Sequence, residues 1–441
     1  MTKGSFKKSA MWMIALQIYG LLLSLFIGPL TVRTLGPELH GDMMYAESII
    51  VIFHTFAQFG LGGIVVAELV QHPDKEEETI GTVMVVRIIM SIVAMLLSAV
   101  TALILKPENK MILFSTYIQT TAIFFLSYEA IDYWFQGRLY NQYFSIISAI
   151  GLTLEDLFKV YLIMKDPDML KFSFANTIRY AFIFICLMFI FYKMNPGFKM
   201  RFNLSLAKKL LSRGFHFFIA SVGTMIYYKI DSLMVGSMID SMSLSFYTVG
   251  LNISDMWQMI PNSISTTAQP VIARYKGKDE KKYIETYQLL LLGITLLCVI
   301  ACIGALLIGK PVILFLYGEP YRNSVLIFYI IIFASIFSSL SMARSNWIVC
   351  EQYETQSKYF VFIGAFLDIV LNYIFIKMYG VIGAALSTLL TEFAVFFLVP
   401  YLFKETRRSN EIYFGCFKRF PELIAYIKLT FNQILKRLKK A

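Results

Sequence analysis

Residues 80–105 read IGTVMVVRIIMSIVAMLLSAVTALIL, an uninterrupted apolar run whose single charged residue is Arg87. A helix needs about 20 consecutive, mostly apolar residues to cross the roughly 30 Å hydrocarbon core of a bilayer. Strands of a membrane barrel instead give segments of about ten residues with alternating polarity. The stretch therefore predicts a membrane-spanning α-helix.

Comparable runs recur along the whole chain. Of its 441 residues, 57% are hydrophobic and 16% charged, and the mean hydropathy is +0.64, which leaves too little polar surface for a water-soluble protein of this size. We expect an all-α integral membrane protein with twelve transmembrane helices. The predicted spans are residues 10–32, 43–70, 80–105, 111–135, 143–164, 172–192, 215–239, 245–271, 283–308, 324–349, 359–378 and 381–403.

Lysine and arginine are distributed unequally between alternate connections. With the amino terminus inside, the cytoplasmic segments hold 27 of the 40 basic residues and the outer loops hold 8. Basic residues concentrate on the cytoplasmic side of membrane proteins. We therefore expect a multi-pass protein with both termini in the cytoplasm.

The longest interruption between the spans is residues 193–214, a basic linker that contains Asn195-Pro196-Gly197. It separates residues 1–192, an N-lobe of six spans, from residues 215–403, a C-lobe of six spans. Residues 404–441 form a basic tail in which apolar residues recur every three or four positions, a pattern typical of an amphipathic helix on the membrane surface. These apolar residues are Ile424, Ile427, Phe431, Ile434 and Leu438.

The sequence lacks the common motifs of enzymes and of metal-binding proteins. Its five cysteines are scattered, mostly in apolar runs, and suggest neither a disulfide framework nor a metal site. We find no phosphate-binding glycine loop and no cluster of metal-ligand histidines. The sequence therefore predicts a protein that is not an enzyme, has no cofactor and binds no nucleic acid.

Five basic residues lie inside predicted spans, where each costs about 3 kcal/mol unless it is paired or hydrated. They are Arg87, Lys159, Arg179, Lys229 and Arg344. Lys159 follows Glu155 by four residues, which favours an ion pair within one helix. Arg87 and Arg179 lie early enough in their spans for their side chains to extend toward the interface, whereas Lys229 and Arg344 each need a partner.

Acidic and polar residues form stripes on two of the spans. Glu47, His54, Gln58 and Glu68 fall within about 80° of one another on a continuous helix, and Glu129, Asp132 and Gln136 form a similar stripe. Either these stripes line a wet cavity or they make hydrogen bonds between helices. Asp231, on the seventh span, points about 200° away from Lys229, so these two residues cannot neutralise each other.

Several short motifs resemble one known family. They are PLTVRTLGPELHG (Pro29–Gly41), FGLG (Phe59–Gly62), WFQG (Trp134–Gly137), DSLMVG (Asp231–Gly236), Asn372, GVIGAA (Gly380–Ala385) and Thr391-Glu392. In this order they resemble the Wzx-type polysaccharide or O-antigen flippases of the multidrug/oligosaccharidyl-lipid/polysaccharide exporter superfamily. The sequence departs from the family at Arg138, where related proteins often carry an acidic residue.

The resemblance implies two six-helix lobes around a central cavity, as in the multidrug exporters of the superfamily, in a bacterial cytoplasmic (inner) membrane. It implies alternating access that moves an undecaprenyl-diphosphate-linked oligosaccharide, destined for O-antigen, lipopolysaccharide, capsule or exopolysaccharide, from the inner to the outer leaflet. Membrane lipids are further partners, and coupling to protons or sodium and a complex with a polysaccharide polymerase are left open.

The candidate site residues follow from this implied cargo. The diphosphate would be bound by Lys229, Arg344, Arg87 and Arg179. The candidates for cavity lining or ion coupling are Glu47, His54, Glu68, Glu129, Asp132 and Asp231. Two alternative functions are a cation-coupled multidrug exporter of the same superfamily and a membrane glycan polymerase or ligase.

Overall fold

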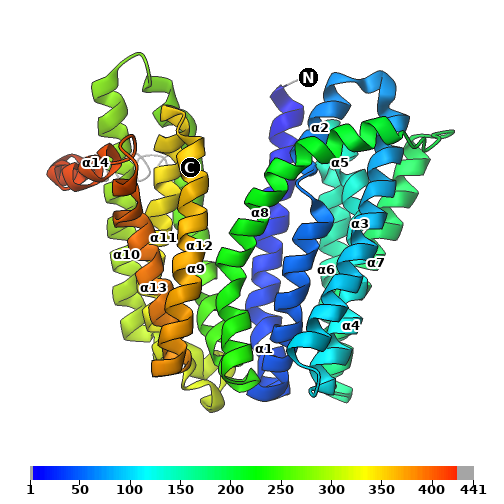
Figure 1. The fold of residues 1–441 in the computed structure, drawn as a ribbon, viewed down its shortest axis with the longest axis horizontal. Coiled ribbons are helices and arrows are strands. Elements are labelled where there is room, and N and C mark those ends of the chain that lie inside the picture. The colour runs from blue at the N-terminus through cyan, green and yellow to red at the C-terminus, as the bar shows by residue number, and fades with distance from the viewer. Residues whose placement is uncertain (1–2, 425–441) are drawn as a thin grey trace, which may run out of the picture. The chain divides into compact units, whose positions relative to one another are not determined.

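The computed structural model describes residues 3–424, and every regular element in that range is helical (Figure 1). The α-helices are α1 (Lys3–Gln58), α2 (Gly62–Gln71), α3 (Glu76–Leu105), α4 (Lys110–Phe125), α5 (Glu129–Gly137), α6 (Asn141–Lys165), α7 (Met169–Met194), α8 (Leu204–Met238), α9 (Ser241–Tyr275), α10 (Glu280–Tyr317), α11 (Ser324–Glu351), α12 (Glu354–Tyr379), α13 (Val381–Phe397) and α14 (Arg408–Cys416). Short 3-10 helices are η1 (Pro73–Lys75), η2 (Leu126–Tyr128), η3 (Glu319–Tyr321), η4 (Val399–Leu402) and η5 (Phe417–Arg419).

Each predicted span is helical over most of its length, so the all-α prediction is confirmed. Seven helical segments in the described part of the chain are long and apolar enough to cross a bilayer. One of them, Met11–Gln71, covers the second predicted span and all of the first except residue 10. The total of twelve spans stays a prediction. The amphipathic helix predicted in the tail begins at Ile424 and otherwise lies outside the described residues.

The helix α3 shows how these helices meet lipid. Ile89, Leu96, Val100 and Ile104 recur at helical spacing and are 50–72% exposed. The opposite face is buried and carries Arg87, Ser91 and Ser98. An apolar outer face with a polar inner face is the arrangement that a lipid solvent favours.

The described chain divides into two compact units. Unit 1 comprises the residues up to Phe246 together with Leu314–Tyr321, and unit 2 comprises Tyr247–Ile313 and the residues from Arg322 onward. The helix α8 belongs to unit 1, where it packs on α1, although it contains the span predicted for residues 215–239. A division by compactness does not test whether six spans are followed by six more. The lobe boundaries at residues 192 and 215 therefore stay a prediction.

The first predicted connection, residues 33–42, is a kink inside α1. Gly36 has φ of 71° and ψ of 171°, a conformation that side-chain-bearing residues rarely adopt, and Pro37 begins the second half of the helix. Proline suits this position because the first amide of a helix has no intrahelical acceptor. The chain therefore turns from its first span into its second without leaving helical geometry for long.

The second predicted span, residues 43–70, is broken. Phe59 and Gly60 have φ of 49° and 63°, which ends α1 at Gln58 and starts α2 at Gly62. A Cβ at Gly60 would lie 2.8 Å from the carbonyl oxygen of Gly214 in α8, so this break also packs tightly. The prediction that Glu68 shares one helical stripe with Glu47 and His54 is wrong, because the break turns Glu68 onto a separate helix.

Aromatic residues form much of the core of each unit. In unit 1, Trp134 packs edge-to-face on Phe135 and Phe191, with ring centroids 5.0 and 5.2 Å apart. In unit 2, α13 packs against both α11 and α12, and Phe396 packs edge-to-face on Tyr413 of α14 at 5.0 Å. These rings hold the helix ends that position the buried charges described next.

Candidate functional site

Arg87 is fully buried in unit 1 and connects three elements. Its Nη1 donates to the carbonyl oxygen of Ala57 at 2.5 Å, and its Nη2 donates to the carbonyl oxygen of Leu126 at 3.1 Å. Both carbonyls lie beside helix breaks, where the last carbonyls of a helix have no intrahelical donor. Arg87 therefore does not extend toward the interface, as its early position in the span allowed, but completes the ends of α1 and α4.

Glu129, the first residue of α5, neutralises Arg87. Its Oε2 lies 2.5 Å from Nη2 of Arg87. Its Oε1 accepts a hydrogen bond from Nε2 of Gln58 at 3.1 Å and lies 3.4 Å from Nε2 of His54. The structure thus brings together three predicted site residues, Arg87, His54 and Glu129, from α3, α1 and α5. Sequence reasoning placed His54 and Glu129 on separate stripes, listed Arg87 apart from both, and did not connect the three.

Asp132 lies one turn after Glu129 and has different surroundings. It is 7% exposed, and its Oδ2 accepts a hydrogen bond from Nε2 of Gln136 at 2.7 Å. Its Oδ1 is buried without a hydrogen-bond partner, and no basic side chain among residues 3–424 pairs with it. The amino-terminal turn of α5 favours a negative charge by about 0.3–1 kcal/mol. That is smaller than the several kcal/mol that an unpaired buried ion costs.

A second ion cluster joins α6 to α7. Glu155 lies 2.5 Å from Nζ of Lys159 and 3.5 Å from Nη1 of Arg179. The intrahelical pair predicted for Lys159 is confirmed. Arg179 also lies over the ring of Tyr180 at 4.9 Å. Glu47 on α1 is half-buried and within electrostatic range of Tyr180.

Glu68 is held at the α2–α8 contact. Its carboxylate lies 2.8 Å from Nζ of Lys209 and 3.4 Å from Nη1 of Arg213, and both basic residues are about half exposed. Lys209 and Arg213 belong to the predicted linker, which is helical from Leu204 onward. The pairs therefore join the second helix to the start of α8 and do not meet His54 or Glu129.

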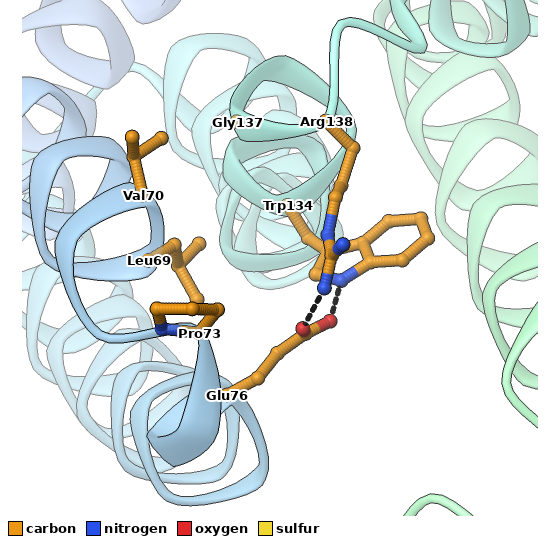
Figure 2. Close-up of a pocket in the computed structure, with 7 residues that line it drawn as sticks. All are labelled: Leu69, Val70, Pro73, Glu76, Trp134, Gly137 and Arg138. Atoms are coloured by element: carbon orange, nitrogen blue, oxygen red, sulfur yellow. Dashed lines mark hydrogen bonds and ion pairs between the residues drawn. The ribbon is translucent and has the colours of Figure 1, made fainter. Parts of the chain in front are cut away.

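A small cavity lies beside Glu76 at the start of α3 (Figure 2). It has a volume of about 150 Å³. Glu76 accepts short hydrogen bonds from the indole Nε1 of Trp134 and from Nη2 of Arg138, and Figure 2 shows all three side chains meeting at one edge. The departure from the family pattern at Arg138 therefore has a local partner. The lining residues are Leu69, Val70, Pro73, Glu76, Trp134, Gly137 and Arg138.

Lys229 and Asp231 lie near the carboxyl-terminal end of α8. Lys229 is half-buried and makes no ion pair or hydrogen bond with any residue from 3 to 424. Asp231 is buried, with 6% of its surface exposed, and is engaged by other groups. Among the four predicted diphosphate-binding residues, Lys229 is the one with neither an ion pair nor a hydrogen bond in the described part of the chain.

Arg344 is buried in unit 2 and, like Arg87, donates to a carbonyl oxygen at a helix end. Its Nη1 donates to the carbonyl oxygen of Phe396 at the end of α13 at 2.5 Å, and its Nη2 donates to Oδ1 of Asn410 in α14 at 2.8 Å. Its guanidinium also lies over the ring of Phe396 at 4.2 Å. The partners of Arg344 are therefore the carbonyl oxygen at the end of α13 and the side-chain amide of Asn410.

Sequence reasoning missed Asp368 of α12. It is 2% exposed, and its Oδ1 accepts hydrogen bonds from Ser387 at 3.4 Å and from Thr391 at 3.2 Å, both of α13. The signal was present, because a carboxylate in the span predicted for residues 359–378 has the same cost as the basic residues that were singled out.

Two family models match the chain. Residues 6–276 match the model described as polysaccharide biosynthesis protein, and residues 217–374 match the MatE model. The first of these covers more than half of the chain. The two matches together overlap every motif on which the family resemblance rests except the last two.

Curated relatives carry transporter and flippase names. The putative O-antigen transporter of Escherichia coli (strain K12) is 21% identical over 400 residues, which is 88% of this chain and 94% of the relative. The probable flippase AglR of Haloferax volcanii is 28% identical over 185 residues, but that match spans 38% of this chain and only 36% of the relative.

Solved structures show the same fold. The lipid II flippase MurJ in an inward closed conformation has a TM-score of 0.70 at 14% identity, over 98% of this chain and 99% of that one. An inward-facing multidrug resistance MATE family transporter has a TM-score of 0.69 at 11% identity, over 88% of this chain and 96% of that one. At these identities the likeness concerns the fold alone, and it confirms the predicted fold class.

Proposed function

Because the chain belongs to the polysaccharide biosynthesis protein family, we propose that it is a flippase for lipid-linked glycans. Its cargo is an undecaprenyl-diphosphate-linked oligosaccharide, which it moves from the inner to the outer leaflet of a bacterial cytoplasmic membrane by alternating access. The observation that carries this proposal is the match to a putative O-antigen transporter over 88% of the chain.

The chemistry of such a cargo explains why a carrier is needed. Each sugar hydroxyl loses several kcal/mol when it enters hydrocarbon without a hydrogen-bond partner. A glycan with about ten hydroxyls therefore cannot cross a bilayer unaided at a useful rate. A protein with polar groups on the inner faces of apolar helices, as on α3, lowers that barrier while the polyprenyl tail stays in lipid.

Basic residues in the spans supply the site for the diphosphate. We rank Lys229 first because its ammonium has neither a counter-ion nor a hydrogen-bond acceptor among residues 3–424. Arg179 follows, since it shares Glu155 with Lys159. Arg87 and Arg344 come last, because helix-end carbonyls and polar side chains already satisfy most of their donors. A diphosphate would have to compete with those contacts.

The membrane potential supports outward movement of such a cargo. Moving two negative charges out of an inside-negative cell is favoured by a free energy of about 4.6 kcal/mol per 100 mV. We also propose that both termini lie in the cytoplasm, as the distribution of basic residues predicts. A polysaccharide polymerase is the partner that would consume the product.

A multidrug exporter is the second candidate, and the match of residues 217–374 to the MatE model favours it. The two functions differ in the charge of the ligand, since exported drugs of this class are cationic whereas the glycan carrier is anionic.

Ligand binding separates the two candidates. The purified protein is heated in detergent with undecaprenyl diphosphate, with undecaprenyl monophosphate or with ethidium. A ligand at 100 times its Kd stabilises a protein by about 2.7 kcal/mol. We expect stabilisation by the diphosphate, with less in Lys229→Gln and an intermediate value in Lys229→Arg. Stabilisation by ethidium alone would favour the drug exporter.

A further inference from the structure

Two carboxylates of α5 lie one turn apart in the interior of unit 1 and differ in their partners. Glu129 faces Arg87 at 2.5 Å and is also contacted by Gln58 and His54. Asp132 is more deeply buried but has a single donor, the amide of Gln136. An ionised carboxylate in such a place needs a counter-charge, so Glu129 has a reason to remain ionised and Asp132 does not.

The groups around Asp132 do not supply that counter-charge. The titratable groups in electrostatic contact with Asp132 are Glu129 and Tyr133 on α5 and Tyr128 on η2. None of them is basic. Arg87 on α3 is engaged by Glu129, and Arg179 on α7 is engaged by Glu155. A buried Oδ1 without a partner remains, and it can accept one proton.

We propose that Asp132 is the proton-binding site that couples this carrier to the proton gradient. A proton from water adds to Oδ1 of the carboxylate and gives the neutral acid, and the same O–H bond breaks when the proton leaves on the other side. No oxidant, reductant or other reactant is required. The identity of the transported cargo rests on the proposed flippase function, whereas the proton site itself does not.

A sodium ion fits this position less well than a proton. A hard cation needs several oxygen ligands around it, whereas the group that meets the other oxygen of Asp132 is the N–H donor of Gln136. No cluster of three or more acidic, histidine or cysteine side chains able to hold a metal occurs within residues 3–424. Proton binding needs only the one free oxygen.

Infrared difference spectroscopy of the full-length protein in lipid tests the site without any glycan. The carbonyl stretch of a protonated carboxylic acid is separate from the carboxylate bands and shifts in heavy water. We expect a protonated-acid band that titrates with pH in the parent, disappears in Asp132→Asn and returns in Asp132→Glu. The matched control is Asp74→Asn, which removes an exposed carboxylate and should leave this band in place. A titrating band that persists unchanged in Asp132→Asn would overturn the proposal.

Transport then separates this inference from the proposed function. Proteoliposomes are loaded with a fluorescent polyprenyl-diphosphate glycan, and flipping is measured with and without a pH gradient. We expect the gradient to accelerate flipping in the parent and to have no effect in Asp132→Asn, with acceleration partly restored in Asp132→Glu. Gradient-driven flipping in Asp132→Asn equal to that of the parent would overturn the proton site while the flippase function stands. A titrating band lost in Asp132→Asn, together with a parent that flips no glycan, would reject the flippase and leave the proton site supported.

Discussion

The guanidinium of Arg87 and the carboxylate of Glu129 form an ion pair of 2.5 Å that ties α3 to α5 inside unit 1. The same guanidinium binds the carbonyl oxygens of Ala57 and Leu126, one beside each of two helix breaks. Arg344 of unit 2 repeats this chemistry at the end of α13. Buried arginines in this protein thus complete helix ends that the membrane interior would otherwise leave without donors.

Neutralising one member of the Arg87–Glu129 pair should destabilise the protein strongly. Breaking a buried pair by removing one partner typically costs about 3–5 kcal/mol, because the other charge is left uncompensated. We expect Glu129→Gln and Arg87→Gln each to lower thermal stability in detergent, and the double variant to lose less than the sum. Strictly additive losses would show that the two side chains are not coupled.

The pair between Glu76 and Arg138 should tolerate exchange of its charges. Arg138→Glu places a second carboxylate beside Glu76 and should lower stability by about 1 kcal/mol, since Arg138 is half exposed. Adding Glu76→Arg should restore part of that loss. Thermal unfolding of the three variants measures this, and the effects should shrink at high salt. If the double variant recovers no stability, the hydrogen bond between Trp134 and Glu76, and not the ion pair, stabilises this region.

Arg344 should control the attachment of α14 to α13. Arg344→Gln removes the donor to Phe396 and weakens the bond to Asn410, which itself donates to the carbonyl oxygen of Phe397 at 2.8 Å. We expect faster hydrogen exchange across residues 396–416 in this variant, with α3 unchanged as the internal control. Unaltered exchange in α14 would mean that aromatic packing on Tyr413 suffices.

The orientation can be tested by cysteine labelling with an impermeant reagent. Single cysteines at Glu108 and Glu319, which are exposed, should react from outside intact cells, whereas one at Lys278 or at the carboxyl terminus should not. Native Cys416 can remain in the background, because burial raises the pKa of its thiol to about 12 and keeps it unreactive. The other four cysteines are replaced. The reverse labelling pattern would invert the predicted topology.

Sequence reasoning located the helices well because long apolar runs are a strong signal. It placed residues 80–105 inside α3 and residues 324–349 inside α11. It missed the break at Phe59–Leu61, although Gly60 and Gly62 mark the place, because the apolar run continues across it. The positive φ at Phe59 comes from tertiary packing against α8 and is not visible in a residue pattern.

The candidate site was predictable in its members but not in its connections. The cost of a buried charge identified Arg87, Glu129, Asp132 and Arg344 from the sequence. Their partners come from helices that are distant in the chain, as Glu129 is from His54 and Arg344 is from Asn410. Which of two neighbouring carboxylates is paired depends on helix packing, so the distinction between Glu129 and Asp132 required the structure.

Glycan flipping itself tests the central claim most directly. Purified protein is reconstituted into liposomes with a polyprenyl-diphosphate glycan that carries a fluorophore, and an impermeant reductant reports how much of it is exposed on the outer leaflet. We predict that the whole fluorescent pool becomes accessible with the parent protein, more slowly with Lys229→Gln, and only the outer half without protein. If the parent, correctly folded and inserted, leaves the inner half protected, this protein is not a flippase for such glycans.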